Sequence, residues 1–150
     1  MIYVLAIIIG ITAGLRAMTP LAAISWGAWL GWIDLSATPF AFMGNIIAVI
    51  IISLIAVGEL ITDQLPATPS RKVPMQFGAR IVLGAFTGAL LLPSNWIVGA
   101  ILGAIGAVIG TLAGAEVRAA LVRNFGRDLP AALIEDVIAI AIAFMVVYLA

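Results

Sequence analysis

The sequence contains no cysteine and no histidine, and it has few charges. Without these two side chains the chain cannot form a disulfide, a thiol or imidazole nucleophile, a haem ligand or a typical zinc site, although carboxylates alone could hold a hard cation. Seven basic and seven acidic residues cancel, so the net charge gives no reason to expect a nucleic acid partner. We therefore expect a protein that is not an enzyme, with no cofactor and no bound metal.

Apolar residues make up 65% of the chain and charged residues only 9%, and the mean hydropathy is +1.28. A soluble domain of 150 residues could not bury that much apolar surface. We therefore expect one all-α integral membrane domain over residues 1–150, surrounded by membrane lipids. The first apolar run has no basic region before it, so we expect a retained helix and not a cleaved signal.

Hydropathy over windows of about 19 residues predicts about five membrane-spanning helices and one shorter apolar segment. The shorter segment, 21–33, falls short of the roughly 20 residues that cross a bilayer, so a re-entrant or interfacial segment is favoured over a full span. A break is expected before it, at Thr19-Pro20, because proline disfavours helix at the preceding residue. The five full spans are predicted at 2–15, 40–62, 77–92, 97–115 and 131–149.

Basic residues gather on one side of the membrane in this five-span arrangement, at the loops 63–77 and 117–130. The positive-inside rule makes this side cytoplasmic, so the N-terminus is expected inside and the C-terminus outside. The four tryptophans and Tyr148 then fall toward the outer interface. Arg71, Lys72, Arg80, Arg118, Arg123 and Arg127 lie on or next to the basic side, and Arg16 lies opposite.

Glycine recurs every third or fourth residue along one predicted helix, at Gly99, Gly103, Gly106, Gly110 and Gly114. A face without side chains lets a neighbouring helix approach closely in a bilayer. Gly84 and Gly88 form a second such face, and because both faces need not be internal, a homo-oligomer is compatible with the pattern. The segments 10–16 and 110–118 also resemble each other weakly, as in the inverted repeats of transporters, although chance would produce a match of this length among so many glycines and alanines.

Three charges have the wrong sign for the helix ends at which they lie. Glu59 and Asp63 are near the C-terminal end of one predicted span, and Arg80 is near the N-terminal start of the next. An unpaired charge near the hydrocarbon costs at least a few kcal/mol. We therefore predict that Arg80 pairs with Glu59 or Asp63.

Three other charges have the sign that their predicted helix ends favour. Glu135 and Asp136 open the last helix and Arg118 closes the one before it, so complementation of the helix dipole is a sufficient explanation. We also predict that Arg118 faces Glu135 or Asp136. Arg16 lies beside the predicted break, where it could bind an anion or a lipid phosphate, or could serve as an interfacial anchor.

The order of these short motifs resembles a known family over nearly the whole chain. The motifs are Gly14-Leu-Arg16-Ala with Pro20-Leu, Glu59 and Asp63 followed by Pro66 and Pro69-Ser-Arg71, Gly78-Ala-Arg80 with Gly84-Ala, the glycine series, and Glu135-Asp136. The chain is similar to small bacterial membrane proteins grouped as domain-of-unknown-function family 4126. The resemblance implies a multi-pass protein of the bacterial inner membrane, and it implies no activity, ligand or catalytic residue.

Two functions fit these observations. In the first, the protein transports or conducts a small solute or ion, and the candidate binding residues are Arg16, Glu59, Asp63, Arg80, Arg118, Glu135 and Asp136. In the second, the protein is a scaffold or assembly subunit of a membrane complex, and the same charges form structural ion pairs. An enzyme that acts on lipid is disfavoured, because the usual nucleophile motifs are missing.

Overall fold

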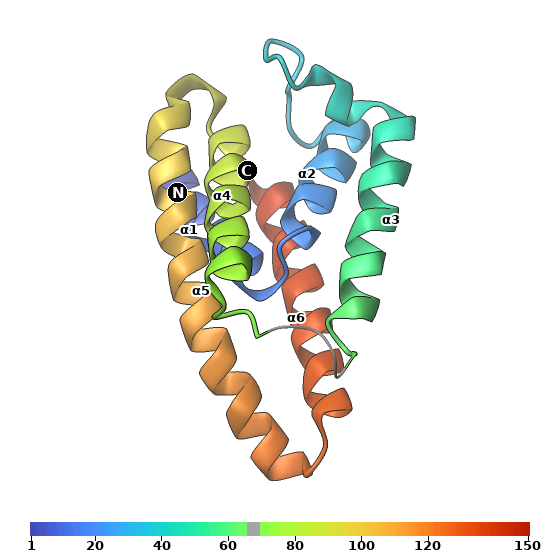
Figure 1. The fold of residues 1–150 in the computed structure, drawn as a ribbon. Coiled ribbons are helices and arrows are strands. Elements are labelled where there is room, and N and C mark those ends of the chain that lie inside the picture. Colours follow the sequence, from blue (N-terminus) through green and yellow to red (C-terminus); the bar gives the residue numbers. More distant parts are fainter. Residues whose placement is uncertain (66–69) are drawn as a thin grey trace.

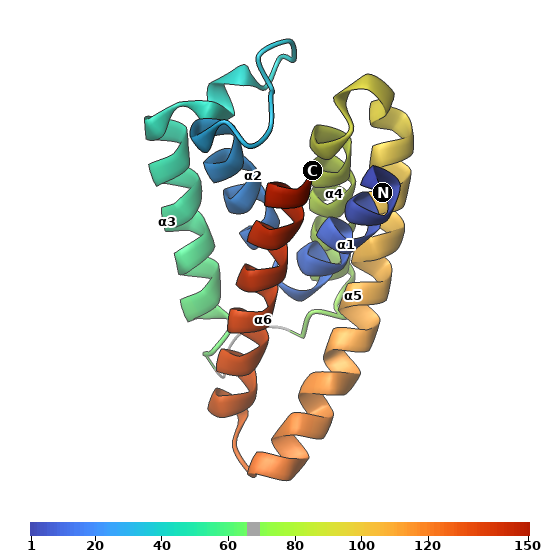
Figure 2. The ribbon, with the colours of Figure 1, turned by 180° about the vertical axis from the view of Figure 1, so that it is seen from behind.

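The chain folds into a helical bundle in which consecutive α-helices run in opposite directions, in a computed structural model that describes residues 1–65 and 70–150 (Figures 1 and 2). Within these residues all regular structure is helical. The α-helices are α1 (Ile2–Leu15), α2 (Thr19–Leu30), α3 (Ile46–Thr62), α4 (Pro74–Leu91), α5 (Trp96–Phe125) and α6 (Asp128–Leu149), and two short 3-10 helices are η1 (Ala41–Gly44) and η2 (Pro93–Asn95).

The break between α1 and α2 lies where the sequence predicts it. Arg16 follows α1 in an extended conformation, and Pro20 occupies the first turn of α2, where its fixed φ suits a helix start. The α2 helix ends at Gly31, which has the positive φ of 76° that glycine accommodates without strain. Most of segment 21–33 thus lies in a helix of its own, whose residues 19–25 are all buried in the bundle.

Both chain termini lie at the same end of the bundle (Figure 1). The prediction that they lie at opposite ends is wrong, because it counted segment 21–33 as a partial crossing, whereas α2 runs back alongside α1. The turn that joins α5 to α6 lies at the other end, and the turn that joins α1 to α2 lies part-way along α5 (Figure 1). The rings of Trp32 and Tyr148 meet at the termini's end, with their centroids 5.3 Å apart.

The glycines of α5 pack against α1 and α4 within the chain. A Cβ added at Gly103 would overlap the carbonyl oxygen of Gly84 on α4, and one added at Gly106 would overlap that of Ile7 on α1. The predicted close approach of helices at this face is therefore found inside one molecule. Because α1 and α4 already occupy these glycines, the pattern no longer argues for a homo-oligomer.

The α1 and α5 helices run in the same direction. Ile7 lies against Gly106, Ile11 against Gly110 and Leu15 against Gly114, so residue numbers rise together along the two helices. Helices related by an inverted repeat would run in opposite directions. The weak similarity of segments 10–16 and 110–118 is therefore not an inverted repeat.

The last two helices are longer than their hydropathy predicts. The α5 helix continues ten residues past Ala115 and ends at Gly126, whose φ is 66°, and α6 begins at Asp128 and not at Ala131. Arg118 therefore does not close its helix, and Glu135 and Asp136 do not open theirs. Complementation of the helix dipole does not explain these three charges, since that effect is confined to the terminal turn.

Two helices are long and apolar enough to cross a membrane: α5 with the preceding turn (Pro93–Phe125), and α6 (Asp128–Leu149). The α1 and α3 helices are apolar but shorter. On α3 only Val49 and Ala56 are buried, while Ile47 and Leu54 are 64% and 67% exposed. So large an exposed apolar surface suits hydrocarbon better than water. The predicted count of five spans is not confirmed, because two helices of the described residues have the length and hydropathy of a span.

We predict that Gly103→Ala destabilises the bundle, because the new methyl group would force α4 away from α5. Overpacking of this kind costs about 1–3 kcal/mol. Gly58→Ala is the matched control, because nothing lies within 4 Å of a Cβ at Gly58 and alanine favours helix. Thermal unfolding of the purified variants in detergent measures the difference, and equal melting temperatures for the two would contradict the packing described.

Candidate functional site

Charged side chains from four helices (α3, α4, α5 and α6) and two connecting segments meet near the place where α1 and α3 end and α4 begins. Figure 1 shows these three helix ends close to one level of the bundle. Within the described residues the charged side chains form a continuous set of ion pairs, which we call the charged cluster. Its members are the arginines Arg16, Arg71, Arg80 and Arg118 and the carboxylates Glu59, Asp63, Asp128, Glu135 and Asp136.

Arg16 lies at the centre of the cluster and has no exposed surface. Its Nη1 is 2.9 Å from Asp63 Oδ2, its Nε is 2.5 Å from Asp136 Oδ1, and its Nη2 is 3.6 Å from Glu135 Oε2. The expectations that Arg16 lies opposite the other basic residues and anchors at an interface are both wrong. The reason is the turn into α2, which brings the end of α1 to the level of the other charges and buries the residue that follows α1.

Arg80 joins α4 to the end of α1. Its Nη1 donates to the carbonyl oxygens of Gly14 and Leu15, at 3.0 and 2.8 Å, and its Nη2 lies 3.3 Å from Asp63 Oδ2 and 3.8 Å from Glu59 Oε1. The predicted pairing of Arg80 with these carboxylates is confirmed. The bonds to α1 were not predicted, and they place a positive charge at the C-terminal end of that helix, where the dipole favours it.

Glu59 makes the complementary contact with the start of α2. Its two carboxylate oxygens accept hydrogen bonds from the backbone N–H groups of Ala17 and Met18, both at 2.7 Å. A carboxylate in this place satisfies donors that the broken chain leaves free and complements the positive end of the α2 dipole. Glu59 and Arg80 have the wrong sign for the ends of α3 and α4, the helices that carry them. Their charges instead complement the dipoles of α2 and α1, whose backbone groups they bind.

The remaining pairs connect α6 to its neighbours. Arg118 Nη1 lies 3.2 Å from Glu135 Oε2, which confirms the second predicted pair, and Arg118 also binds Asp128 at 2.7 Å. Arg71 donates from both terminal nitrogens to the two oxygens of Glu135. Gln64 donates to Asp136 at 3.1 Å.

Three residues of this region, Arg71, Gln64 and Asp128, were not predicted as members of the site. Arg71 and Gln64 lie in the proline-rich link between α3 and α4, which reads as a solvated loop. One feature of the sequence could have indicated Arg71 and Gln64. The link joins the end of α3 to the start of α4, whose charges were predicted to pair, so polar side chains in the link lie close to those charges.

A cavity of about 600 Å³ adjoins the charged cluster on the side away from the chain termini. Asp63 and Arg80 belong to both the cluster and the cavity wall, so the cavity reaches the buried charges. Its wall holds four arginines and two aspartates, an excess of two positive charges. The lining residues are Asp63, Leu65, Ser70, Arg71, Gln76, Arg80, Ala115, Arg118, Ala119, Val122, Arg123 and Asp128.

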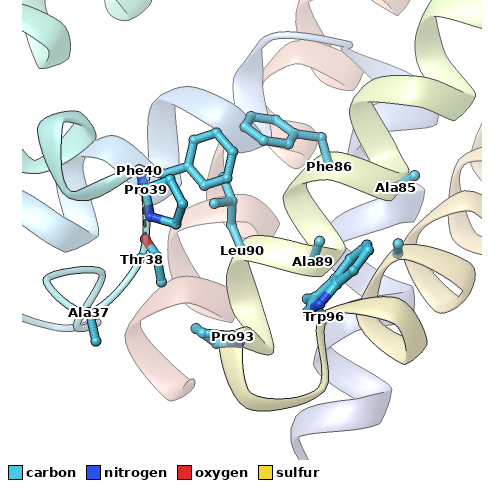
Figure 3. Close-up of a pocket in the computed structure, with 11 residues that line it drawn as sticks. Ala37, Thr38, Pro39, Phe40, Ala85, Phe86, Ala89, Leu90, Pro93 and Trp96 are labelled. Carbon is cyan, nitrogen blue, oxygen red and sulfur yellow. Dashed lines mark hydrogen bonds between the residues drawn. The ribbon is translucent and has the colours of Figure 1, made fainter.

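A second cavity of about 540 Å³ lies nearer the opposite end, between the 37–40 segment and helices α4 and α5. Figure 3 shows Phe40, Phe86 and Trp96 around it, with Leu90 between Phe40 and Trp96 and Pro93 on the far side from Phe86. No charged residue lines it. Its apolar wall suits hydrocarbon, so it is separate in both position and chemistry from the charged cluster.

In the part of the chain that the structure describes, these features define a helical protein with two helices that could cross a membrane and with a largely buried, interconnected set of ion pairs. The family described as a domain of unknown function, DUF4126, matches residues 3–149, so the chain belongs to this family. No curated protein and no solved structure matches the chain.

We predict that Arg80→Ala destabilises the protein strongly, because it leaves two α1 carbonyl groups without their donor and the partly buried Glu59 without its arginine. Breaking a buried pair on one side costs about 3–5 kcal/mol. Lys72→Ala is the control, since it removes the exposed pair with Glu116, and such pairs contribute about 0–1 kcal/mol. Thermal unfolding of both variants measures the contrast, and a small effect of Arg80→Ala would show that the contacts with α1 are dispensable.

Proposed function

We propose that the protein is an integral membrane protein of the bacterial inner membrane that transports or conducts a small solute or ion. In this proposal the charged cluster is the binding site and the adjoining cavity is its entrance. The observation that carries the proposal is the cavity wall itself, because Asp63 and Arg80 belong at once to the entrance and to the buried ion pairs.

The interrupted helix supports this function. Transporters place their sites where a helix breaks inside the bundle, because freed backbone groups and helix ends can then bind the solute. Here the break between α1 and α2 lies beside Glu59 and Arg80. Toward the end that holds the termini, the buried core includes Ile24, Leu91 and Val147, with the hydroxyl groups of Ser25 and Thr87 bound to backbone carbonyl groups. The polar cavity described above approaches the cluster from the other side.

The orientation in the proposal follows from the basic residues. Arg71, Lys72, Arg123 and Arg127 lie in or next to the links that join α3 to α4 and α5 to α6, and Arg16, Arg80 and Arg118 belong to the charged cluster. The C-terminal ends of α3 and α5 lie away from the chain termini (Figure 1), and the positive-inside rule makes that side cytoplasmic. Both termini are then outside. This replaces the expectation of a cytoplasmic N-terminus, which depended on segment 21–33 being only a partial crossing.

A second candidate function is that of a scaffold or assembly subunit, in which the charges are structural. One observation favours it: each of the candidate residues Arg16, Glu59, Asp63, Arg80, Arg118, Glu135 and Asp136 has an oppositely charged partner. A site in which all charges are satisfied holds helices together without any ligand. The two functions differ in whether the protein produces flux.

We predict solute-dependent flux in proteoliposomes, tested with inorganic cations and anions, small organic acids and amines. The informative variant is the double substitution Arg16→Gln with Asp136→Asn, which removes one charge of each sign. Asp63 keeps Arg80, and Glu135 keeps Arg71 and Arg118. Because no buried charge loses all its partners, the variant should stay folded.

Flux that falls at least tenfold in this double variant, with the melting temperature kept, is the expected result. Lys72→Ala should leave the flux unchanged, since that side chain is outside the cluster. Flux that persists in the folded double variant would show that the cluster is not the site. If no solute produces flux and a stoichiometric protein partner copurifies, the scaffold function replaces transport.

A further inference from the structure

The arginines of the cavity wall differ in how many of their guanidinium nitrogens already have a hydrogen-bond partner. Arg118 uses all three guanidinium nitrogens on Asp128 and Glu135. The terminal nitrogens of Arg80 and of Arg71 are likewise bound. Arg123 has no hydrogen bond or ion pair with any described residue, so its guanidinium is free to meet a ligand that enters the cavity.

The size and lining of the cavity limit what that ligand can be. A volume of about 600 Å³ is far larger than an inorganic ion and falls within the range of about 300–1,000 Å³ typical of small-molecule sites. Beside the charges the wall presents apolar side chains, including Ala115, Ala119 and Val122 on α5. Ala119 and Arg123 are four residues apart and therefore share one helix face.

We propose that this cavity binds an organic anion, whose carboxylate or phosphate group meets Arg123 while its apolar part lies against α5. Arg71, Arg80 and Arg118 are paired with carboxylates, so Arg123 supplies the unpaired positive charge among the described residues of the wall. Its planar guanidinium can bind carboxylate or phosphate with two parallel hydrogen bonds. The inference rests on the proposed function in taking the cavity as an entrance. It adds the chemical class of the ligand and the residue that recognises it.

Calorimetric titration of the purified protein in neutral detergent tests the ligand class without requiring flux. The probes are benzoate and phenyl phosphate, with benzylamine as a cation of similar size and inorganic phosphate as an anion with no apolar part. We expect the two organic anions to bind, benzylamine not to bind, and inorganic phosphate to bind at least tenfold more weakly than phenyl phosphate. Nanodiscs with and without phosphatidylglycerol test whether a lipid headgroup supplies the same anion.

Arg123→Gln should weaken binding of phenyl phosphate at least tenfold. Arg127→Gln is the matched control, because Arg127 is also an exposed arginine at the same end but does not line the cavity, and it should change the affinity less than twofold. Both substitutions remove one positive charge, so a general electrostatic effect would weaken binding equally in the two. Both positions are exposed, so folding should be preserved.

The outcomes separate this inference from the transport proposal. Binding of the organic anions that depends on Arg123 supports the anion site even if no flux is found, in which case transport alone fails. Competition between phosphatidylglycerol and phenyl phosphate, lost in Arg123→Gln, supports the site with a lipid headgroup as its natural anion. Preference for benzylamine, no binding of any anion, or equal effects of the two substitutions would overturn the anion site.

Discussion

A helix that stops inside a bundle leaves amide hydrogens and carbonyl oxygens without partners, and a buried group of this kind costs free energy unless something else satisfies it. The turn between α1 and α2 creates that situation at the level where several helices meet. Glu59 accepts from two N–H groups before α2, and Arg80 donates to two carbonyl groups at the end of α1. Asp63 connects these contacts to the rest of the charged cluster, because it pairs with both Arg80 and Arg16.

Close helix packing makes these bonds geometrically available. Gly14 has no room for a side chain, because a Cβ there would lie 2.5 Å from the backbone nitrogen of Thr111 on α5. The end of α1 is therefore held against α5, and Gly84 and Gly88 hold α4 against the same helix. Arg80, one turn before Gly84, consequently reaches the carbonyl oxygen of Gly14. The small residues and the charges act together: the glycines set the distance between helices, and the charges satisfy the backbone at that distance.

The charge pairs could be predicted from the sequence, but their purpose could not. Wrong signs at helix ends predicted that Arg80 meets Glu59 or Asp63, and it does. The charges were compared only with the dipoles of α3 and α4, the helices that carry them. Glu59 and Arg80 instead bind backbone groups at the start of α2 and the end of α1. Hydropathy failed for 21–33 and for the ends of α5 and α6, because it measures how much chain would cross a bilayer and not where a helix stops. Because segment 21–33 was counted as a partial crossing, Arg16 was expected on the side of the membrane opposite the other basic residues.

The central claim is that Glu59 satisfies the backbone at the α1–α2 break, and amide hydrogen exchange at Ala17 and Met18 tests it most directly. A hydrogen bond to a charged group contributes about 1.5–3 kcal/mol, which corresponds to roughly tenfold to a hundredfold slower exchange. In Glu59→Ala both amides should exchange faster by that factor, whereas Glu116→Ala, a change on the exposed surface, should leave them as they are. Unchanged protection of Ala17 and Met18 in Glu59→Ala would contradict the account.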